Sequence, residues 1–306
     1  MNRREGLLRI ALGMAGTAAG AGLPVNDAVS ALASPLARPI PSSGEALPVI
    51  GLGTWQTFDV GPSPAQRAPL ADVLRSFLEL GGRLVDSSPM YGRSEEVVGE
   101  LTAGLGARER LFVATKVWTE GARAGIAQME DSMRKLRADP IDLMQVHNLV
   151  DVDTHLDTLR DWKQAGRVRY VGVTHYTAGA HQAVARLIAM RPVDFVQINY
   201  SVGEREAERR LLPLARERRV AVIVNRPFGG GGLLGRLRSR PLPAWAAEIG
   251  CTSWAQLLLK FVISHPAVTC AIPATSRVAH LRDNMAAGRG SLPDEGLRAR
   301  IAAAAQ

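Results

Sequence analysis

The sequence predicts one α/β domain folded as a (β/α)8 TIM barrel with an N-terminal β-hairpin. Apolar runs of strand length alternate with segments of helical periodicity along most of the 306 residues. This alternation is typical of βαβ units and a parallel sheet. Eight such runs favour closure into a barrel. Gly51 and Gly53 lack the third glycine of a dinucleotide-binding fingerprint, which argues against a doubly wound sheet.

The first 33 residues differ from the rest of the chain. Arg3 and Arg4 precede a weakly apolar stretch at 10–23, and an A-x-A site ends at Ala33. This order is similar to a twin-arginine export signal. We therefore expect export to the periplasm, with 34–306 forming the barrel domain and no stable membrane insertion after signal cleavage. The alternative is a cytoplasmic protein that starts at an internal site.

The barrel elements follow in chain order. Two short extended pieces lie within 38–49, on either side of a Ser-Gly pair that is typical of a hairpin. The predicted strands are 47–52, 83–86, 111–117, 141–147, 168–174, 194–199, 220–225 and 267–272. Helical periodicity is clear over 70–80, 126–136, 177–190 and 207–218.

Composition argues against several classes of protein. Lys and Arg number 37 against 29 Asp and Glu, but the basic residues are scattered over helical segments without interleaved aromatics, so we expect no nucleic-acid partner. Cys251 and Cys270 set neither a disulfide framework nor a metal-ligand spacing. Asp151, Asp153 and His155 have the composition of metal ligands. They begin a predicted helix, where acids act as caps, and we expect no metal site.

Four polar residues fall at or just after predicted strand ends. The segment 81–100 predicts a strand, a loop and a helix, with Asp86 at the strand tip and Tyr91 in the loop. The next two strands carry Lys116 and His147 near their ends. A buried lysine must be paired, and Asp86 is the obvious partner. The neighbouring cation is expected to lower the pKa of Tyr91, while His147 can hydrogen-bond a carbonyl group.

Each of the four also has a purely structural explanation: a cap, a loop tyrosine, a salt-bridged lysine and a core histidine. Taken together, Asp86, Tyr91, Lys116 and His147 resemble the catalytic tetrad of the aldo-keto reductase family, and the likeness spans 38–292. The resemblance implies a barrel closed at its bottom by the hairpin. It also implies reduction of an aldehyde or ketone, with hydride from NAD(P)H and a proton from Tyr91. We expect a monomer.

The resemblance extends to the cofactor site, less uniformly. Gly53-Thr54-Trp55 resembles the family's opening motif near the nicotinamide ribose. Thr174-His175 stands where the family usually has Ser-Asn, and Asn225 replaces a tyrosine that commonly stacks on the nicotinamide ring. The residues implied to bind the cofactor are Gly53, Thr54, Trp55, Asp86, Thr174, His175, Gln197, Asn225, Pro227, Phe228, Gly229, Ser276, Arg277 and Asn284.

The segments that follow the seventh and eighth predicted strands have features of phosphate sites. Glycines 229–232 expose backbone N–H groups suited to a pyrophosphate, or form a flexible loop. Phosphate sites in such barrels cluster after strands seven and eight. Ser276 and Arg277 suit the adenosine 2′-phosphate, which favours NADPH over NADH, although Ala274 and His280 replace a common Lys and Arg.

Two functions from different classes are left open. One is an NAD(P)H-dependent carbonyl reductase. The other is an NADP(H)-binding regulatory subunit or sensor on the same fold, as the family's ion-channel-associated members suggest. The intact tetrad favours the enzyme. Trp55, Trp118 and Phe228 either line an apolar substrate pocket or serve as packing.

Overall fold

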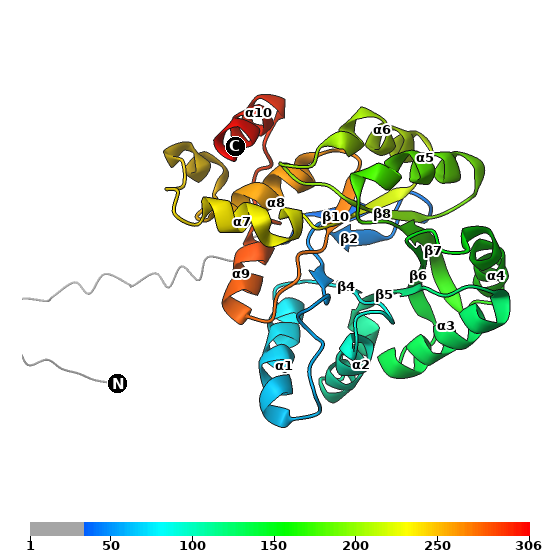
Figure 1. The fold of residues 1–306 in the computed structure, drawn as a ribbon. Coiled ribbons are helices and arrows are strands. Elements are labelled where there is room, and N and C mark those ends of the chain that lie inside the picture. Colours follow the sequence, from blue (N-terminus) through cyan, green and yellow to red (C-terminus); the bar gives the residue numbers. More distant parts are fainter. Residues whose placement is uncertain (1–33) are drawn as a thin grey trace, which may run out of the picture. The chain divides into compact units, whose positions relative to one another are not determined.

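Eight parallel strands form a barrel surrounded by helices (Figure 1). The computed structural model describes residues 34–306; the predicted export signal lies outside the described residues and stays a prediction. Around the sheet the strands are β3 (Leu52–Gly53), β4 (Leu84–Asp86), β5 (Phe112–Val117), β6 (Ile141–His147), β7 (Val168–Thr174), β8 (Phe195–Asn199), β9 (Ala221–Asn225) and β10 (Val268–Ala271). Bridges from Ile50 to Ala271 and from Gly53 to Ala274 join β10 to β3. The predicted closed barrel is confirmed.

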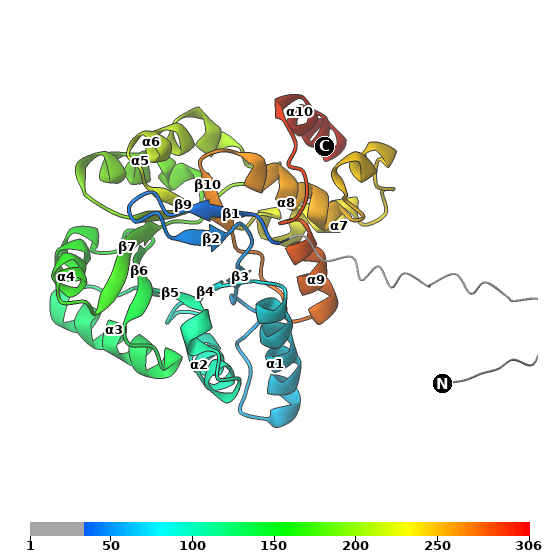
Figure 2. The same cartoon turned by 180° about the vertical axis from the view of Figure 1, so that it is seen from behind.

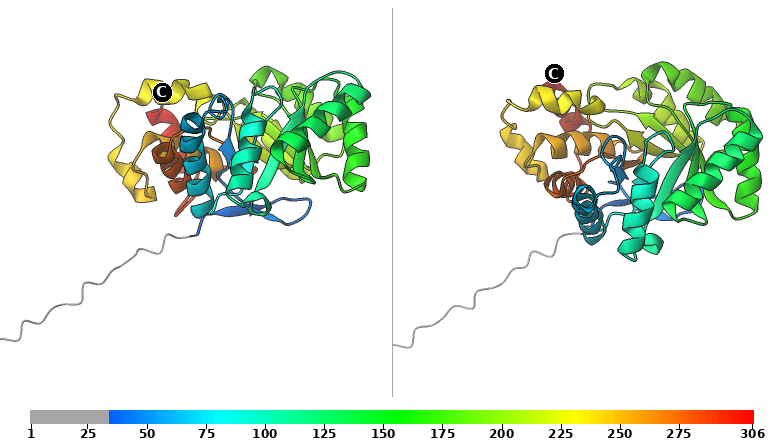
Figure 3. Two further views of the ribbon diagram at one scale, coloured as in Figure 1. Left: turned by 90° about the horizontal axis from the view of Figure 1, so that it is seen from below. Right: turned by 60° about the horizontal axis from the view of Figure 1, so that its bottom comes forward.

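The helices lie outside the ring of strands (Figure 1), and Figure 3 shows the molecule from two further directions. They are α1 (Pro64–Glu79), α2 (Ser94–Gly104), α3 (Ala122–Leu136), α4 (Val152–Gln164), α5 (His181–Met190), α6 (Leu211–Glu217), α7 (Gly232–Leu237), α8 (Trp254–Ser264), α9 (Val278–Ala286) and α10 (Glu295–Ala304). Short 3-10 turns are η1 (Arg108–Arg110), η2 (Ala178–Ala180), η3 (Glu206–Arg209), η4 (Gly229–Gly231) and η5 (Ala244–Ile249). Within the described part of the chain, no helix is long and apolar enough to cross a membrane.

The first predicted strand is wrong in its extent. The run 47–52 divides between β2 (Ala46–Pro48) of the hairpin and the short barrel strand β3. Pro48 has no N–H to donate, and the hairpin ladder with β1 (Ala37–Pro39) ends there. The chain then turns into the barrel, where Gly51 N donates to Ala271 O at 2.8 Å.

The hairpin closes one end of the barrel. Ile40 and Leu47 pack into the barrel interior against Phe112 and Phe195, the first residues of β5 and β8. Figure 2 shows β1 and β2 lying across the strands in the view from behind. The N-terminal ends of the strands are therefore covered, and the carboxyl ends are left for a site.

The inward-facing side chains change from apolar to polar along the barrel strands. On β5, Phe112 and Ala114 belong to the apolar interior, and Lys116 follows on the same face. On β6, Leu143 is followed on the same face by Gln145 and His147. A strand alternates its side chains between two faces, so these residues line one inner wall. The wall is apolar at the hairpin end and polar at the open end.

Helices α2 and α3 approach closely at Gly99. A Cβ atom at Gly99 would lie 1.9 Å from the carbonyl oxygen of Lys135, far inside van der Waals contact. We predict that Gly99→Ala lowers the free energy of unfolding by about 2 kcal/mol, because the two helix backbones must move apart. Urea denaturation of the purified protein measures this change.

Gly104 at the end of α2 provides the matched control, since a Cβ there meets nothing within 4 Å. We expect Gly104→Ala to leave stability equal or slightly higher, because alanine is the better helix former. Equal stabilities for Gly99→Ala and the unsubstituted protein would contradict the close approach.

Candidate active site

A buried ion pair stands at the centre of the polar end of the barrel. The Lys116 ammonium lies 2.6 Å from Asp86 Oδ2, and both side chains are almost fully buried. The same ammonium donates to the carbonyl oxygen of Ser87 at 2.6 Å. A buried cation requires a partner of this kind, so the predicted pairing of Lys116 with Asp86 is confirmed.

Two glutamine amides bind the other oxygen of the Asp86 carboxylate. Gln197 Nε2 on β8 donates to Asp86 Oδ1 at 2.8 Å, and Gln145 Nε2 on β6 donates to it at 3.2 Å. Gly172 on β7 lies between these strands, and a Cβ there would come within 3.2 Å of Gln145 Cγ. Sequence reasoning missed Gln145, although a buried polar residue two positions before His147 must share its face.

Tyr91 lies in the loop between β4 and α2, beside this ion pair. The Lys116 ammonium is 4.9 Å from the centroid of the Tyr91 ring. Burial raises the pKa of Tyr91 above its ordinary value, the Lys116 charge lowers it, and the Asp86 charge raises it. The effect of burial is the largest, and the net pKa of Tyr91 is raised. The expectation that Lys116 brings this pKa down toward neutrality is therefore wrong. The phenol is protonated at neutral pH.

Lys116 keeps its charge in this environment. Burial by itself lowers the pKa of the ammonium, but the charge of Asp86 and the hydrogen bond to its carboxylate outweigh burial, and the net shift is upward. The site therefore holds a fixed cation next to a protonated phenol at neutral pH.

His147 ends β6 and faces the same space. Its ring centroid lies 6.1 Å from that of Tyr91 in an edge-to-face arrangement. Its Nδ1 atom is 3.2 Å from Ser88 Oγ, a contact that sequence reasoning also missed. Burial, followed by the charges of Lys116 and His175, lowers the pKa of His147 to about 3. The imidazole is neutral across the physiological range.

A second set of hydrogen bonds connects the ion pair to the neighbouring strand ends. Gln197 Oε1 accepts from Thr174 Oγ1 at 3.2 Å and from Asn225 Nδ2 at 3.4 Å. Thr54 Oγ1 donates to the carbonyl oxygen of Asp86 at 3.0 Å. Asn225 Oδ1 is buried and has no hydrogen-bond partner within residues 34–306. The structure thus brings these four predicted residues into one network with Asp86.

Two further predicted residues lie beside this network. Asn225 Nδ2 also donates to the carbonyl oxygen of His175 at 3.2 Å. His175 Nδ1 accepts from Tyr176 N at 3.0 Å, so only its Nε2 is left for another group. Gly53 forms a bridge with Ala274, which places the start of the 274–277 segment at the same rim.

The remaining predicted residues stand apart from the ion pair. Ser276 and Arg277 are exposed before α9, and in the described chain neither contacts Asp86, Tyr91, Lys116 or His147. The environments of the other predicted cofactor residues are as follows: Trp55 is 46% exposed, Pro227 is buried, Phe228 is partly buried against the core, Gly229 has a left-handed backbone (φ 59°) and Asn284 is buried in α9.

Asp151, Asp153 and His155 each have a different partner. Asp151 occupies the N-cap position of α4, but its carboxylate accepts from Gly121 N at 2.7 Å and makes no capping hydrogen bond to a backbone N–H of that helix. Asp153 pairs with Arg191 at 2.9 Å. His155 is buried, with Nε2 2.7 Å from the carbonyl oxygen of Thr119. The predicted capping role of Asp151 is therefore wrong, although its position at the helix start is right.

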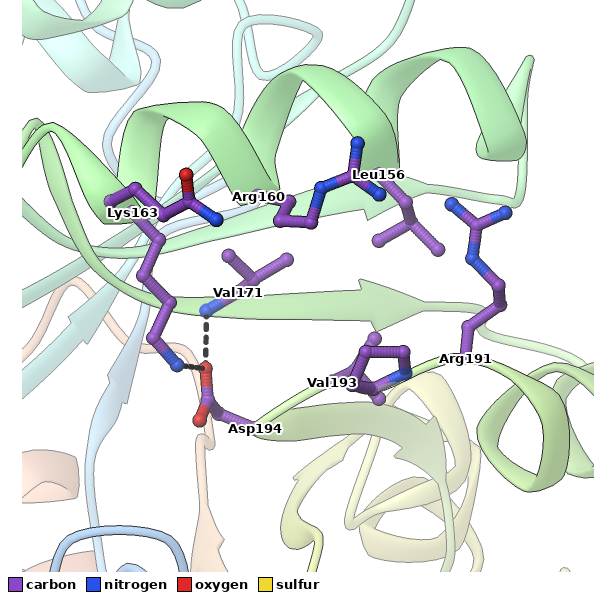
Figure 4. Close-up of a pocket in the computed structure, with 9 residues that line it drawn as sticks. Leu156, Arg160, Lys163, Val171, Arg191, Val193 and Asp194 are labelled. Atoms are coloured by element: carbon purple, nitrogen blue, oxygen red, sulfur yellow. Dashed lines mark hydrogen bonds and ion pairs between the residues drawn. The ribbon is translucent and has the colours of Figure 1, made fainter.

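A surface cavity of about 370 Å³ lies elsewhere, between α4 and the segment that precedes β8 (Figure 4). Its three cations are already paired: Lys163 with Asp194 at 2.6 Å, Arg191 with Asp157 at 2.6 Å and Arg160 with Asp157 at 3.2 Å. An anionic ligand would have to break these pairs. The residues that line the cavity include none of the predicted site residues: Leu156, Arg160, Lys163, Gln164, Val171, Arg191, Pro192, Val193 and Asp194.

The chain matches known proteins over most of its length. A family model described as the Aldo/keto reductase family matches residues 49–303. Methylglyoxal reductase YeaE of Escherichia coli (strain K12) is 33% identical over 255 residues, which cover 80% of this chain and 87% of that protein.

Solved structures agree with this match. An aldo/keto reductase from Klebsiella pneumoniae in complex with NADPH has a TM-score of 0.69 at 29% identity, covering 84% of this chain and 91% of its own. The holo form of aldo-keto reductase AKR11C1 from Bacillus halodurans has a TM-score of 0.72 at 22% identity, covering 87% and 95%, and supports the fold alone.

The low pKa of His147 predicts acid sensitivity of the fold. The ordinary histidine pKa is 6.5, and that of folded His147 is about 3. Between these values the unfolded chain binds a proton that the folded chain does not, so stability is lost as pH falls through this window. The contribution is about 1.4 kcal/mol per pH unit. Urea denaturation at pH 6.5, 5.5 and 4.5 measures it.

His147→Gln should lower this slope by about 1.4 kcal/mol per pH unit, because it removes one titrating group. His265, whose pKa burial lowers to about 4, keeps its own contribution to the slope. His280→Gln, at an exposed position, is the control and should leave the slope unchanged. An identical slope in all three proteins would show that His147 does not carry the effect.

Proposed function

Because the chain belongs to the aldo/keto reductase family, we propose that it reduces an aldehyde or ketone to the alcohol, with NADPH as cofactor and Tyr91 as proton donor. The observation that carries this proposal is the convergence of Tyr91, Lys116 and His147 on one buried polar space. NADPH, when bound, supplies the hydride that adds to the carbonyl carbon. NADH is the less favoured cofactor.

The residues of the chain handle the proton. The Tyr91 phenol is protonated at neutral pH because burial raises its pKa. When it releases its proton to the carbonyl oxygen, the phenolate forms next to the Lys116 ammonium, whose positive charge stabilises it. Asp86 holds that ammonium in place at 2.6 Å. His147, neutral and at the same opening, orients the carbonyl group through a hydrogen bond.

The residues at the strand ends suit a nicotinamide cofactor. Asn225 Oδ1 is buried without a partner in the described chain and can accept from a carboxamide N–H. Thr174 and Gln197 offer further polar atoms in the same network. Arg277 is exposed and makes no ion pair in residues 34–306, so its guanidinium is free for a 2′-phosphate. We assign the nicotinamide end of the cofactor to the first group and its phosphate end to Arg277.

The rival function is a regulatory NADP(H)-binding subunit without turnover. It needs the cofactor residues but neither a proton donor nor a cation to stabilise a phenolate. The buried Lys116–Asp86 pair next to Tyr91 favours the reductase, because a binding protein gains nothing from the desolvation that this pair costs.

Tyr91→Phe tests the proposed proton donor. We expect kcat for aldehyde reduction to fall at least about a thousandfold, since the substituted ring has no proton to give. NADPH binding, followed by quenching of protein fluorescence, should stay nearly unchanged. NADPH oxidation is measured with a panel of aldehydes that begins with methylglyoxal, because the E. coli relative is named a methylglyoxal reductase.

Tyr170→Phe is the control for that experiment. It removes a phenol at the hairpin end of the barrel, where Tyr170 OH donates to Ser43 Oγ at 2.7 Å, and it should leave kcat unchanged. Retained turnover in Tyr91→Phe would refute the role given to Tyr91. Absence of turnover in the unsubstituted protein with every aldehyde and ketone would favour the regulatory subunit.

Arg277→Ala tests the cofactor assignment. We expect the Kd for NADPH to rise about tenfold, because a charge-assisted contact with the 2′-phosphate is lost, and the Kd for NADH to change little. Arg282→Ala, which removes an exposed arginine on α9 just after Arg277, should change neither. Isothermal titration calorimetry of both variants and of the unsubstituted protein measures the Kd values for the two cofactors. An equal loss of NADPH and NADH affinity in Arg277→Ala would contradict a 2′-phosphate contact.

A further inference from the structure

Ser88 and His147 meet in the interior although they lie on different elements. Ser88 is fully buried in the loop that follows β4, and His147 ends β6 with 6% of its surface exposed. Ser88 Oγ and His147 Nδ1 are 3.2 Å apart, which is within hydrogen-bond distance. The contact joins the loop that carries Tyr91 to the histidine at the same opening.

The surroundings of Ser88 decide the direction of this hydrogen bond. A serine hydroxyl has one proton to donate and can accept from other groups. Ser88 Oγ already accepts from the backbone N–H of Met90 at 3.4 Å. In the described chain its only other partner is His147 Nδ1, so the hydroxyl proton points to the ring.

The protonation of His147 then follows. A neutral imidazole has one N–H donor and one acceptor nitrogen. If Nδ1 accepts from Ser88, the proton must sit on Nε2. Within residues 34–306 the Nε2 atom has no hydrogen-bond partner, while the Tyr91 and Trp118 rings lie 6.1 and 6.5 Å from the imidazole centroid. An Nε2–H group is therefore available to a ligand beside Tyr91.

We infer that Ser88 is a positioning residue that holds His147 as its Nε2–H tautomer, ready to donate to the carbonyl oxygen of the substrate. This inference rests on the proposed reductase function. In the opposite tautomer, the Nε2 lone pair would face the lone pairs of the carbonyl oxygen and repel them. The Ser88 carbonyl oxygen also accepts from Tyr91 N at 3.0 Å, so one residue fixes both the proton donor and the orienting histidine.

The tautomer can be measured without any turnover. Nitrogen-15 NMR of ring-labelled histidine separates protonated from unprotonated ring nitrogens, and His147→Asn identifies the His147 signals among the six histidines. We expect Nε2 of His147 to be protonated and Nδ1 to be hydrogen-bonded and unprotonated in the free protein. In Ser88→Ala we expect a mixture of the two tautomers.

The kinetic expectation is a kcat about tenfold lower in Ser88→Ala, the effect of one lost hydrogen bond, with an unchanged Kd for NADPH by fluorescence. Ser132→Ala is the matched control. Its hydroxyl is equally buried and donates to Glu95 Oε2 at 3.1 Å, away from His147. It should change neither the His147 signals nor kcat.

Three results would overturn the inference: protonated Nδ1 in the unsubstituted protein, unchanged His147 signals in Ser88→Ala, or an equal loss of kcat in Ser132→Ala. Failure of the proposed function is distinguishable from these. A protein without reductase activity would still show, through its nitrogen signals, whether Ser88 sets the tautomer of His147.

Discussion

The buried ion pair between Lys116 and Asp86 is the constraint on which the rest of the site depends. Neither charge can be left alone in the barrel interior, because an unpaired buried ion costs about 3–5 kcal/mol. The pair in turn demands further donors, and Gln145 and Gln197 supply them to the second carboxylate oxygen. Four strands, β4, β5, β6 and β8, are thereby connected by side-chain hydrogen bonds at one level of the barrel. The network is stable only as a whole, since each missing donor would leave a buried acceptor unsatisfied.

The fold confines this polar cluster to one end of the barrel. At the other end the hairpin residues Ile40 and Leu47 belong to a buried apolar cluster with the aromatic side chains that begin β5 and β8. At the polar end, Gly172 has no side chain, and this leaves room for Gln145, whose amide reaches Asp86. Apolar packing at the hairpin end stabilises the barrel and so offsets the free energy that the buried polar groups cost.

Electrostatics decides the protonation states of Tyr91, Lys116 and His147. Burial raises the pKa of Tyr91 and lowers that of His147 to about 3, so the phenol keeps its proton and the imidazole stays neutral. Lys116 stays charged because its interactions with the Asp86 carboxylate outweigh its burial. A protonated donor, a fixed cation and a neutral hydrogen-bonding ring are what proton transfer to a carbonyl oxygen requires. In the reductase function that we propose, Lys116 acts by stabilising the phenolate product more than by bringing the pKa of the phenol to neutrality.

The sequence by itself determined the barrel, most of its strand boundaries and the rim on which Asp86, Tyr91, Lys116 and His147 meet. Hydrophobic period and strand-end position are local properties, and parallel strands bring their ends to one side. Tertiary structure decided the split of the first strand, the partner of Asp151, and the contacts of Gln145 and Ser88. Asp86 and Gln145 are 59 positions apart, as are Ser88 and His147, while Asp86 and Gln197 are 111 apart. Contacts over such separations depend on the register between strands and on where small residues such as Gly172 leave room. Neither can be deduced from the local sequence pattern alone.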